Sequence, residues 1–203
     1  MNERPGFGNE GGTARALVVV DVQNDFCDVP GAALPVGGGA VLAGRISDYV
    51  RACTDCYAAV VATRDWHIDP GDHFSDEPDY AGTWPPHCRA GSTGAAFHPD
   101  LDTAAFDQIF SKGQYSASYT GFDGVGSDDT TLEDWLHSRD LRAVDVVGIA
   151  TDYCVRATVL DATRLGFATR VLADLCAGVA PDTTRAALAE MAGVAEVVGL
   201  PPH

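Results

Sequence analysis

The chain has 203 residues, of which 46% are hydrophobic, a composition that supports a buried core and argues against intrinsic disorder. Its 29 acidic and 13 basic side chains give a net charge of −16, which disfavours nucleic acid and anionic membranes as partners. No apolar stretch approaches the ~20 residues that span a bilayer, and no basic start with an apolar run marks a signal peptide. We therefore expect a soluble, cytoplasmic protein with a flexible tail over residues 1–14 and a single domain over residues 15–203.

Short apolar runs alternate with helix-like segments along the chain, and a long irregular stretch over residues 66–106 separates the second strand from the third. Strands are expected at residues 16–20, 58–63, 108–111, 144–149, 168–172 and 195–198. Helices are expected at residues 40–54, 131–138, 151–166 and 181–192. This alternation predicts an α/β fold with a doubly wound, six-stranded, mainly parallel sheet and helices on both faces, a Rossmann-like three-layer arrangement.

Chemically active residues follow four of the predicted strands. Asp21, Asp65, Lys112 and the segment 150–154 each come directly after a different strand, and Lys112 is the only lysine among thirteen basic residues. In doubly wound sheets the working site lies outside the carboxyl ends of the strands. Packing alone would favour apolar residues at these positions, so the pattern indicates a site.

Cys154 is the candidate nucleophile of this site. It falls in the first turn of a helix whose N-cap is expected at Thr151, where the helix dipole favours the thiolate. Asp21 could accept the thiol proton, and Lys112 could stabilise the resulting charges. The amides of Ala150 and Cys154 could form an oxyanion hole for acyl transfer to water through a thioester. The alternative is that Cys154 is only a small buried hydrophobic residue.

The irregular stretch contains a set of potential metal ligands. Asp65, His67 and His73 lie within nine residues, and His87 follows in the segment WPPHC. One carboxylate and three imidazoles suit a divalent Zn, Fe or Mn ion. The alternative is that these residues only decorate a polar loop, as we expect for His98.

Three aromatic residues are expected in loops near the same strand ends. Phe26, Trp84 and Tyr119 could together enclose a flat ring substrate. Each of them alone would more often belong to the core.

In combination, these motifs resemble the nicotinamidase/pyrazinamidase family of isochorismatase-like cysteine hydrolases, and most closely its mycobacterial type. The similarity extends over nearly everything after the first fourteen or so residues. The matching segments are VVVDVQNDFC (18–27), DWHIDPGDHFS (65–75), WPPHCRAGSTGAAFHP (84–99), SKGQYSASYTGFDG (111–124), VDVVGIATDYCVRATVLDA (144–162) and ATRVLADLCAGV (168–179).

The resemblance implies an enzyme of NAD salvage that converts nicotinamide to nicotinate and ammonia, and pyrazinamide to pyrazinoate, with a metal ion that binds the ring nitrogen. It assigns the catalytic triad to Asp21, Lys112 and Cys154, the metal ligands to Asp65, His67, His73 and His87, and ring contacts to Phe26, Trp84 and Tyr119. It also implies a cis peptide bond before Ala150. Tyr153 stands where the mycobacterial type has His.

Three other interpretations compete with this one, and the sequence favours none of them over it. A related amidohydrolase acting on an isochorismate-like, carbamoyl or ureido substrate would share the acid, lysine and cysteine but generally lack the metal loop. A non-catalytic member of the fold would be expected to have lost one of these three residues, and a structural zinc protein would not place its ligands beside an open nucleophile. The expected partner is a small carboxamide substrate. The protein itself is expected to be a monomer or a small homo-oligomer.

Overall fold

The computed structural model describes residues 14–53 and 55–199, so the expected tail, apart from Ala14, lies outside the described residues. Six strands form one sheet in the order β3-β2-β1-β4-β5-β6, and every pair of neighbours is parallel. The strands are β1 (Arg15–Val20), β2 (Ala59–Asp65), β3 (Gln108–Lys112), β4 (Ala143–Ile149), β5 (Ala168–Ala177) and β6 (Glu196–Val198). The helices are α1 (Gly39–Ala52), α2 (Leu132–His137), α3 (Arg156–Arg164) and α4 (Pro181–Met191).

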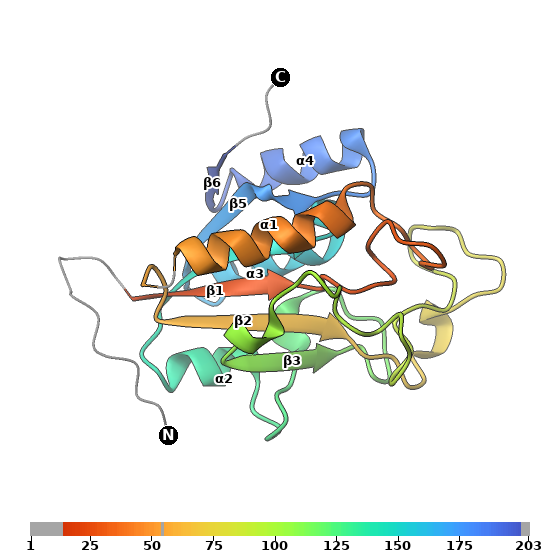
Figure 1. Ribbon diagram of the computed structural model, residues 1–203, viewed down its shortest axis with the longest axis horizontal. Helices are drawn as coiled ribbons and strands as arrows, with labels where there is room; N and C mark the ends of the chain where they lie inside the picture. Colours follow the sequence, from red (N-terminus) through yellow and green to blue (C-terminus); the bar gives the residue numbers. More distant parts are fainter. Residues whose placement is uncertain (1–13, 54, 200–203) are drawn as a thin grey trace.

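Apart from charged residues such as Arg15, Arg64 and Asp145, the central strands are apolar, which suits a sheet covered by helices on both faces. In β1, Leu17 and Val19 pack with Ile46 of α1 on one face. Val18 and Val20 point to the opposite face, which is covered by α2, α3 and α4. The predicted α/β fold with a six-stranded sheet and helices on both faces is therefore confirmed (Figure 1).

The order of the strands reverses between β1 and β4, which pair with each other at the middle of the sheet. Gly148 makes this close pairing possible, because a Cβ at its φ of +124° would lie 2.1 Å from the Val20 carbonyl oxygen. The strands point in one direction, and the loops that follow β1 and β2 gather beyond their carboxyl ends (Figure 1). A crevice at such a reversal is the usual ligand site of a doubly wound sheet.

The segment after β4 differs from the expected regular helix. Residues Thr151–Val155 form a π-helical turn that leads into α3, and Ala150 occupies the cap position without a side-chain hydrogen bond. The expected N-cap at Thr151 is therefore wrong, because Thr151 already lies inside the first turn. The peptide bond between Ile149 and Ala150 is cis, as the resemblance implied.

Two further differences concern burial and length. His98 is only 6% exposed rather than a surface residue, and its ring Nδ1 accepts a hydrogen bond from the Asp100 amide. β5 continues five residues past the predicted end at Leu172, and its pairing with β4 shifts register between Val146 and Gly148.

Within the described part of the chain, no helix combines the length and apolar character needed to cross a membrane.

Candidate active site

The ends of four strands place chemically active side chains around one cavity of about 290 Å³. Asp65 and Cys154 line this cavity, and Asp21 and Lys112 lie behind them with no exposed surface. Asp65 and Lys112 are the last residues of β2 and β3, and Asp21 directly follows β1. The parallel sheet thus brings together residues that are up to 133 positions apart, from Asp21 to Cys154.

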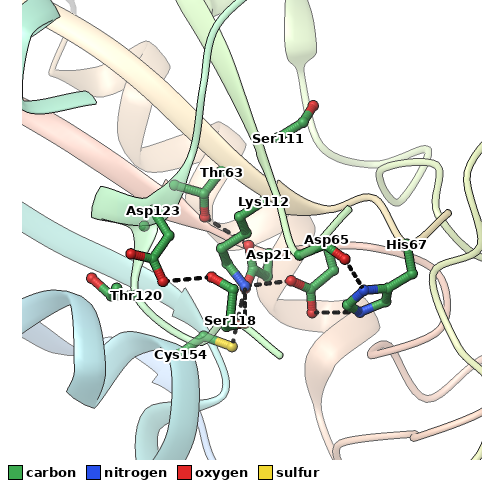
Figure 2. A network of polar contacts seen from close by, with 12 residues as sticks. Asp21, Thr63, Asp65, His67, Ser111, Lys112, Ser118, Thr120, Asp123 and Cys154 are labelled. Atoms are coloured by element: carbon green, nitrogen blue, oxygen red, sulfur yellow. Dashed lines mark hydrogen bonds and ion pairs between the residues drawn. The ribbon is translucent and has the colours of Figure 1, made fainter. Parts of the chain in front are cut away.

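Lys112 stands at the centre of the polar network in Figure 2. Its ammonium nitrogen lies 2.9 Å from Asp21 Oδ2 and forms a close ion pair with Asp65 Oδ1. It also donates to the Ser118 carbonyl at 3.2 Å and lies 3.7 Å from Cys154 Sγ. One buried cation therefore contacts two carboxylates and the candidate nucleophile.

The two carboxylates have different proton affinities in this network. Burial raises the pKa of Asp21 above its usual value, against the opposing effects of Lys112 and the Thr63 hydroxyl. Burial acts in the same direction on Asp65, but Lys112 and His67 hold the pKa of Asp65 well below its usual range. Burial lowers the proton affinity of Lys112, yet the two carboxylates raise its pKa well above the ordinary value. Asp21 is accordingly the better proton acceptor, while Asp65 remains an anion.

The thiol of Cys154 is protonated in this environment. Burial raises the pKa of Cys154 well above its ordinary value, and Lys112 only partly opposes this effect. The expectation that the first helical turn favours the thiolate is therefore outweighed by desolvation. Because a carboxylate oxygen of Asp21 and Cys154 Sγ lie within 4.8 Å of each other, Asp21 is the candidate acceptor for the proton whose loss forms the thiolate.

The main chain around Cys154 carries the two amides that are expected to form an oxyanion hole. The carbonyl of Ala150 accepts hydrogen bonds from the amides of Tyr153 at 3.0 Å and Val155 at 3.1 Å, and the Cys154 amide lies between these two. Ala150 and Cys154 both line the cavity. An oxyanion hole made of the Ala150 and Cys154 amides stays a prediction that this arrangement permits.

Three imidazoles gather beside the carboxylates. One ring nitrogen from each of His67, His73 and His87 lies within 4.8 Å of the others, and all three side chains are buried. Asp65 belongs to a second group with Asp21 and Cys154, but its Oδ2 lies 3.7 Å from His67 Nε2. Asp65 therefore connects the histidine cluster with the lysine network.

The hydrogen bonds of these rings fit a metal site. His67 Nδ1 donates to the Gly113 carbonyl at 2.6 Å and His87 Nδ1 to the Pro85 carbonyl at 2.8 Å, which leaves the Nε2 lone pair of each ring free for a metal. His67 Nε2 and His73 Nδ1 are buried with no hydrogen-bond partner. Burial and the neighbouring histidines lower the pKa of His73 to about 4, which keeps its ring in the neutral, metal-binding form.

The cavity walls are mainly aromatic and aliphatic. Phe26, Trp84 and Tyr119 all line it, as does Tyr153, whose ring packs edge-on against Trp84 with 5.1 Å between centroids. The Trp84 indole donates to the Tyr119 hydroxyl at 2.9 Å, which fixes both rings. A flat, weakly polar ring fits these walls, and Asp65, Cys154, His73 and His87 also line the cavity.

Three buried polar residues near the site were missed by sequence reasoning. The Thr63 hydroxyl donates to Asp21 Oδ1 at 2.6 Å, the Ser118 hydroxyl donates to Asp123 Oδ2 at 2.9 Å, and Gln23 bonds the main chain of Asp65. The available signal was weak: Thr63 is a polar residue in a mainly apolar strand, Gln23 comes shortly after β1, and Ser118 lies in a loop without any local signal.

A family model for the isochorismatase domain matches residues 15–200. The chain belongs to this family, which confirms the class that the motifs and the fold indicated. Within it, the chain is 60% identical over 177 residues to the nicotinamidase/pyrazinamidase of Mycobacterium tuberculosis, covering 87% of this chain and 94% of that relative.

Solved structures show the same fold. The pyrazinamidase of Pyrococcus horikoshii in complex with zinc superposes with a TM-score of 0.75 at 38% identity, covering 92% of this chain and 99% of that one. PnC1 of L. infantum in complex with nicotinate superposes with a TM-score of 0.77 at 34% identity, covering 92% of each chain. This chain therefore shares its fold with a pyrazinamidase and with a protein solved in complex with nicotinate.

Proposed function

We propose that the chain is a metal-dependent cysteine amidohydrolase that converts nicotinamide to nicotinate and ammonia. Its relatives named nicotinamidase or pyrazinamidase support this substrate class. The observation that carries the proposal is the position of Lys112, within ion-pair distance of Asp21 and Asp65 and 3.7 Å from Cys154 Sγ, next to three gathered imidazoles.

The reaction begins with a proton transfer from the Cys154 thiol to Asp21. The thiolate attacks the carboxamide carbon to form a C–S bond, and the oxygen that gains negative charge accepts hydrogen bonds from the Ala150 and Cys154 amides. Asp21 then returns the proton to the nitrogen as the C–N bond breaks and ammonia leaves. Water attacks the thioester, which releases nicotinate and restores the thiol.

Lys112 makes this proton transfer possible in a buried site. Without its charge, Asp21 and Asp65 would be two adjacent carboxylates, and one of them would hold a proton at neutral pH. With Lys112 in place, the Asp21 carboxylate is available to accept the thiol proton. The ion pair also stabilises the thiolate in the low-dielectric cavity.

Asp65, His67, His73 and His87 would hold a divalent metal ion, for which Zn, Fe and Mn are the candidates. Such an ion, when bound, acts as a Lewis acid and orients the substrate through its ring nitrogen. A zinc complex of the Pyrococcus horikoshii pyrazinamidase supports zinc among these three.

The test is ammonia release from nicotinamide, measured before chelation, after chelation and after add-back of zinc, iron or manganese. We expect activity to fall on chelation and to return with at least one metal, while Cys154→Ala stays inactive throughout. Pyrazinamide is expected to behave in the same way. A metal-free protein that is fully active, with carbamoyl or ureido compounds preferred over nicotinamide, would support the related amidohydrolase instead.

We also infer that the protein acts in NAD salvage in the cytoplasm and that it is a monomer or a small homo-oligomer. The aromatic walls around a cavity of about 290 Å³ support a small-molecule partner, and the net charge of −16 argues against nucleic acid. Size-exclusion chromatography with light scattering would measure the oligomeric state.

A further inference from the structure

The segment Gln23–Asp25, two residues after Asp21, connects two parts of the histidine and carboxylate cluster. Gln23 is fully buried, and its side-chain amide donates to the Asp65 carbonyl at 2.8 Å and to the Ala95 carbonyl at 2.9 Å. Its amide oxygen accepts from the Asp65 amide at 2.8 Å. Gln23 therefore satisfies both main-chain polar groups of Asp65 and ties them to the loop that follows His87.

These hydrogen bonds take the place of strand pairing, because β1 does not extend far enough to pair with Asp65. The pairing of β1 with β2 ends at Val20 and Thr63, because Asp21 adopts a left-handed φ of 49° and turns the chain away. On its other side, Asp65 still pairs with Lys112 of β3. On the β1 side, the Gln23 side chain supplies the two main-chain hydrogen bonds that a neighbouring strand would otherwise make with Asp65. These bonds are needed because a buried amide and a buried carbonyl each require a partner.

Asp25 makes a second connection, to the chain directly after His87. Its Oδ2 accepts from the Cys88 amide at 2.7 Å and its Oδ1 from the Ala33 amide at 3.2 Å. The Cys88 carbonyl in turn accepts from the His67 amide at 3.0 Å. A Cβ at Gly94 would lie 2.1 Å from Asp25 Oδ2, so the loop approaches this carboxylate as closely as only glycine allows.

We propose that Gln23 and Asp25 are positioning residues that set the affinity of the cluster for a divalent metal ion, an inference that rests on the proposed function. Neither side chain is needed as a ligand. Gln23 holds the backbone of Asp65, and Asp25 holds the backbone of Cys88, which follows His87 and whose carbonyl accepts from the His67 amide. Together they determine the distance between ligands that come from two separate segments, 65–73 and 87.

The intervening residue is a matched control. The Asn24 side chain also bonds the same loop, donating to the Thr93 carbonyl at 2.9 Å, but this contact is exposed and touches no candidate ligand. Asn24→Ala therefore removes a hydrogen bond of the same segment without loosening the cluster. Gln23→Met preserves length while it removes all three buried bonds. Asp25→Asn keeps the shape but can accept from only one of the two amides that face it.

The experiment measures the zinc affinity of the chelator-treated protein by competition with a chromophoric chelator, and the absorption spectrum of the cobalt-loaded protein. Loss of groups that orient metal ligands typically weakens affinity about 10–100-fold. We expect this loss in Gln23→Met and Asp25→Asn, together with altered cobalt bands, and a zinc affinity within about twofold of wild type in Asn24→Ala. Melting curves of the metal-free proteins establish that each variant is folded.

The outcomes separate this proposal from the proposed function. Folded Gln23→Met and Asp25→Asn proteins with wild-type zinc affinity and a wild-type cobalt spectrum would overturn the positioning role without affecting the proposed metal site. A loss of zinc affinity in Asn24→Ala as large as in these two variants would also overturn it. A wild-type protein that binds no zinc and no cobalt would overturn the metal itself and this inference with it. Should Gln23→Met fail to fold, Asp25→Asn, which changes one atom, decides the question.

Discussion

Replacing Lys112 by methionine tests whether the buried cation holds two carboxylates together. Methionine has a similar length and no charge, so Lys112→Met leaves Asp21 and Asp65 facing each other without a counter-ion. All three side chains are at most 4% exposed, and water therefore cannot replace the lost ammonium without opening the structure. The variant is expected to be inactive and much less stable.

The size of the stability loss follows from the geometry. At the 2.9 Å between Lys112 Nζ and Asp21 Oδ2, the Coulomb attraction is about 6 kcal/mol for an effective dielectric constant of ~20. Lower desolvation cost in the variant offsets part of this, and removal of one partner of a buried pair typically costs about 3–5 kcal/mol. For a chain of this size, the corresponding drop in melting temperature is roughly 6–20 °C.

Urea denaturation in the presence of a chelator measures the loss without any contribution from bound metal. In Lys112→Met, Asp21 and Asp65 either repel each other or must take up a proton, and a second variant, Asp21→Asn combined with Lys112→Met, removes this conflict. We expect this double variant to be more stable than Lys112→Met alone, because the substitutions act on one network. A Lys112→Met protein as stable as wild type, or a double variant less stable than the single one, would refute the reasoning.

Three smaller predictions address the nucleophile, the sheet and the start of α1. Cys154→Ala should abolish ammonia release while the melting temperature stays close to wild type; residual turnover above background would remove the nucleophile assignment. Gly148→Ala should destabilise the protein by at least about 2 kcal/mol in urea, because its Cβ would meet the Val20 carbonyl, and an unchanged midpoint would contradict this. Hydrogen bonds from the first amides of α1 hold the pKa of Asp28 below its usual value, so its stabilising effect is present above about pH 4 and lost as the pH falls. Asp28→Ala should therefore lower the melting temperature at pH 7 and lower it less near pH 3. An equal drop in melting temperature at both pH values would show that the charge of Asp28 does not stabilise the start of α1.

The positions of the strands along the chain could be predicted because local apolar patterns determine them. Val18 to Val20 are apolar on both faces, and Val144 to Ile149 are apolar apart from Asp145, which is typical of the buried centre of a parallel sheet. The polar residues that end these runs, Asp21 among them, indicated the site because parallel strands deliver their carboxyl ends to one edge.

Other features depend on contacts between distant segments and leave no local trace. The residues Thr151–Val155 give no local signal that separates their π-helical turn from the expected α-helix. The pKa of Cys154 depends on burial more than on its place in a helix. Gln23 looks like any polar loop residue until the main chain of Asp65 is placed beside it. His98 is buried by chain segments that its own neighbours do not reveal.

The most direct test of the central claim is to look for the covalent intermediate. Wild-type protein is mixed with excess nicotinamide, quenched with acid during turnover and digested for mass spectrometry. We expect a nicotinoyl group on the peptide that carries Cys154, reduced or absent in Asp21→Asn. Rapid ammonia release with no acyl group on that peptide, even when the quench precedes steady state, would contradict the role of Cys154 as the nucleophile.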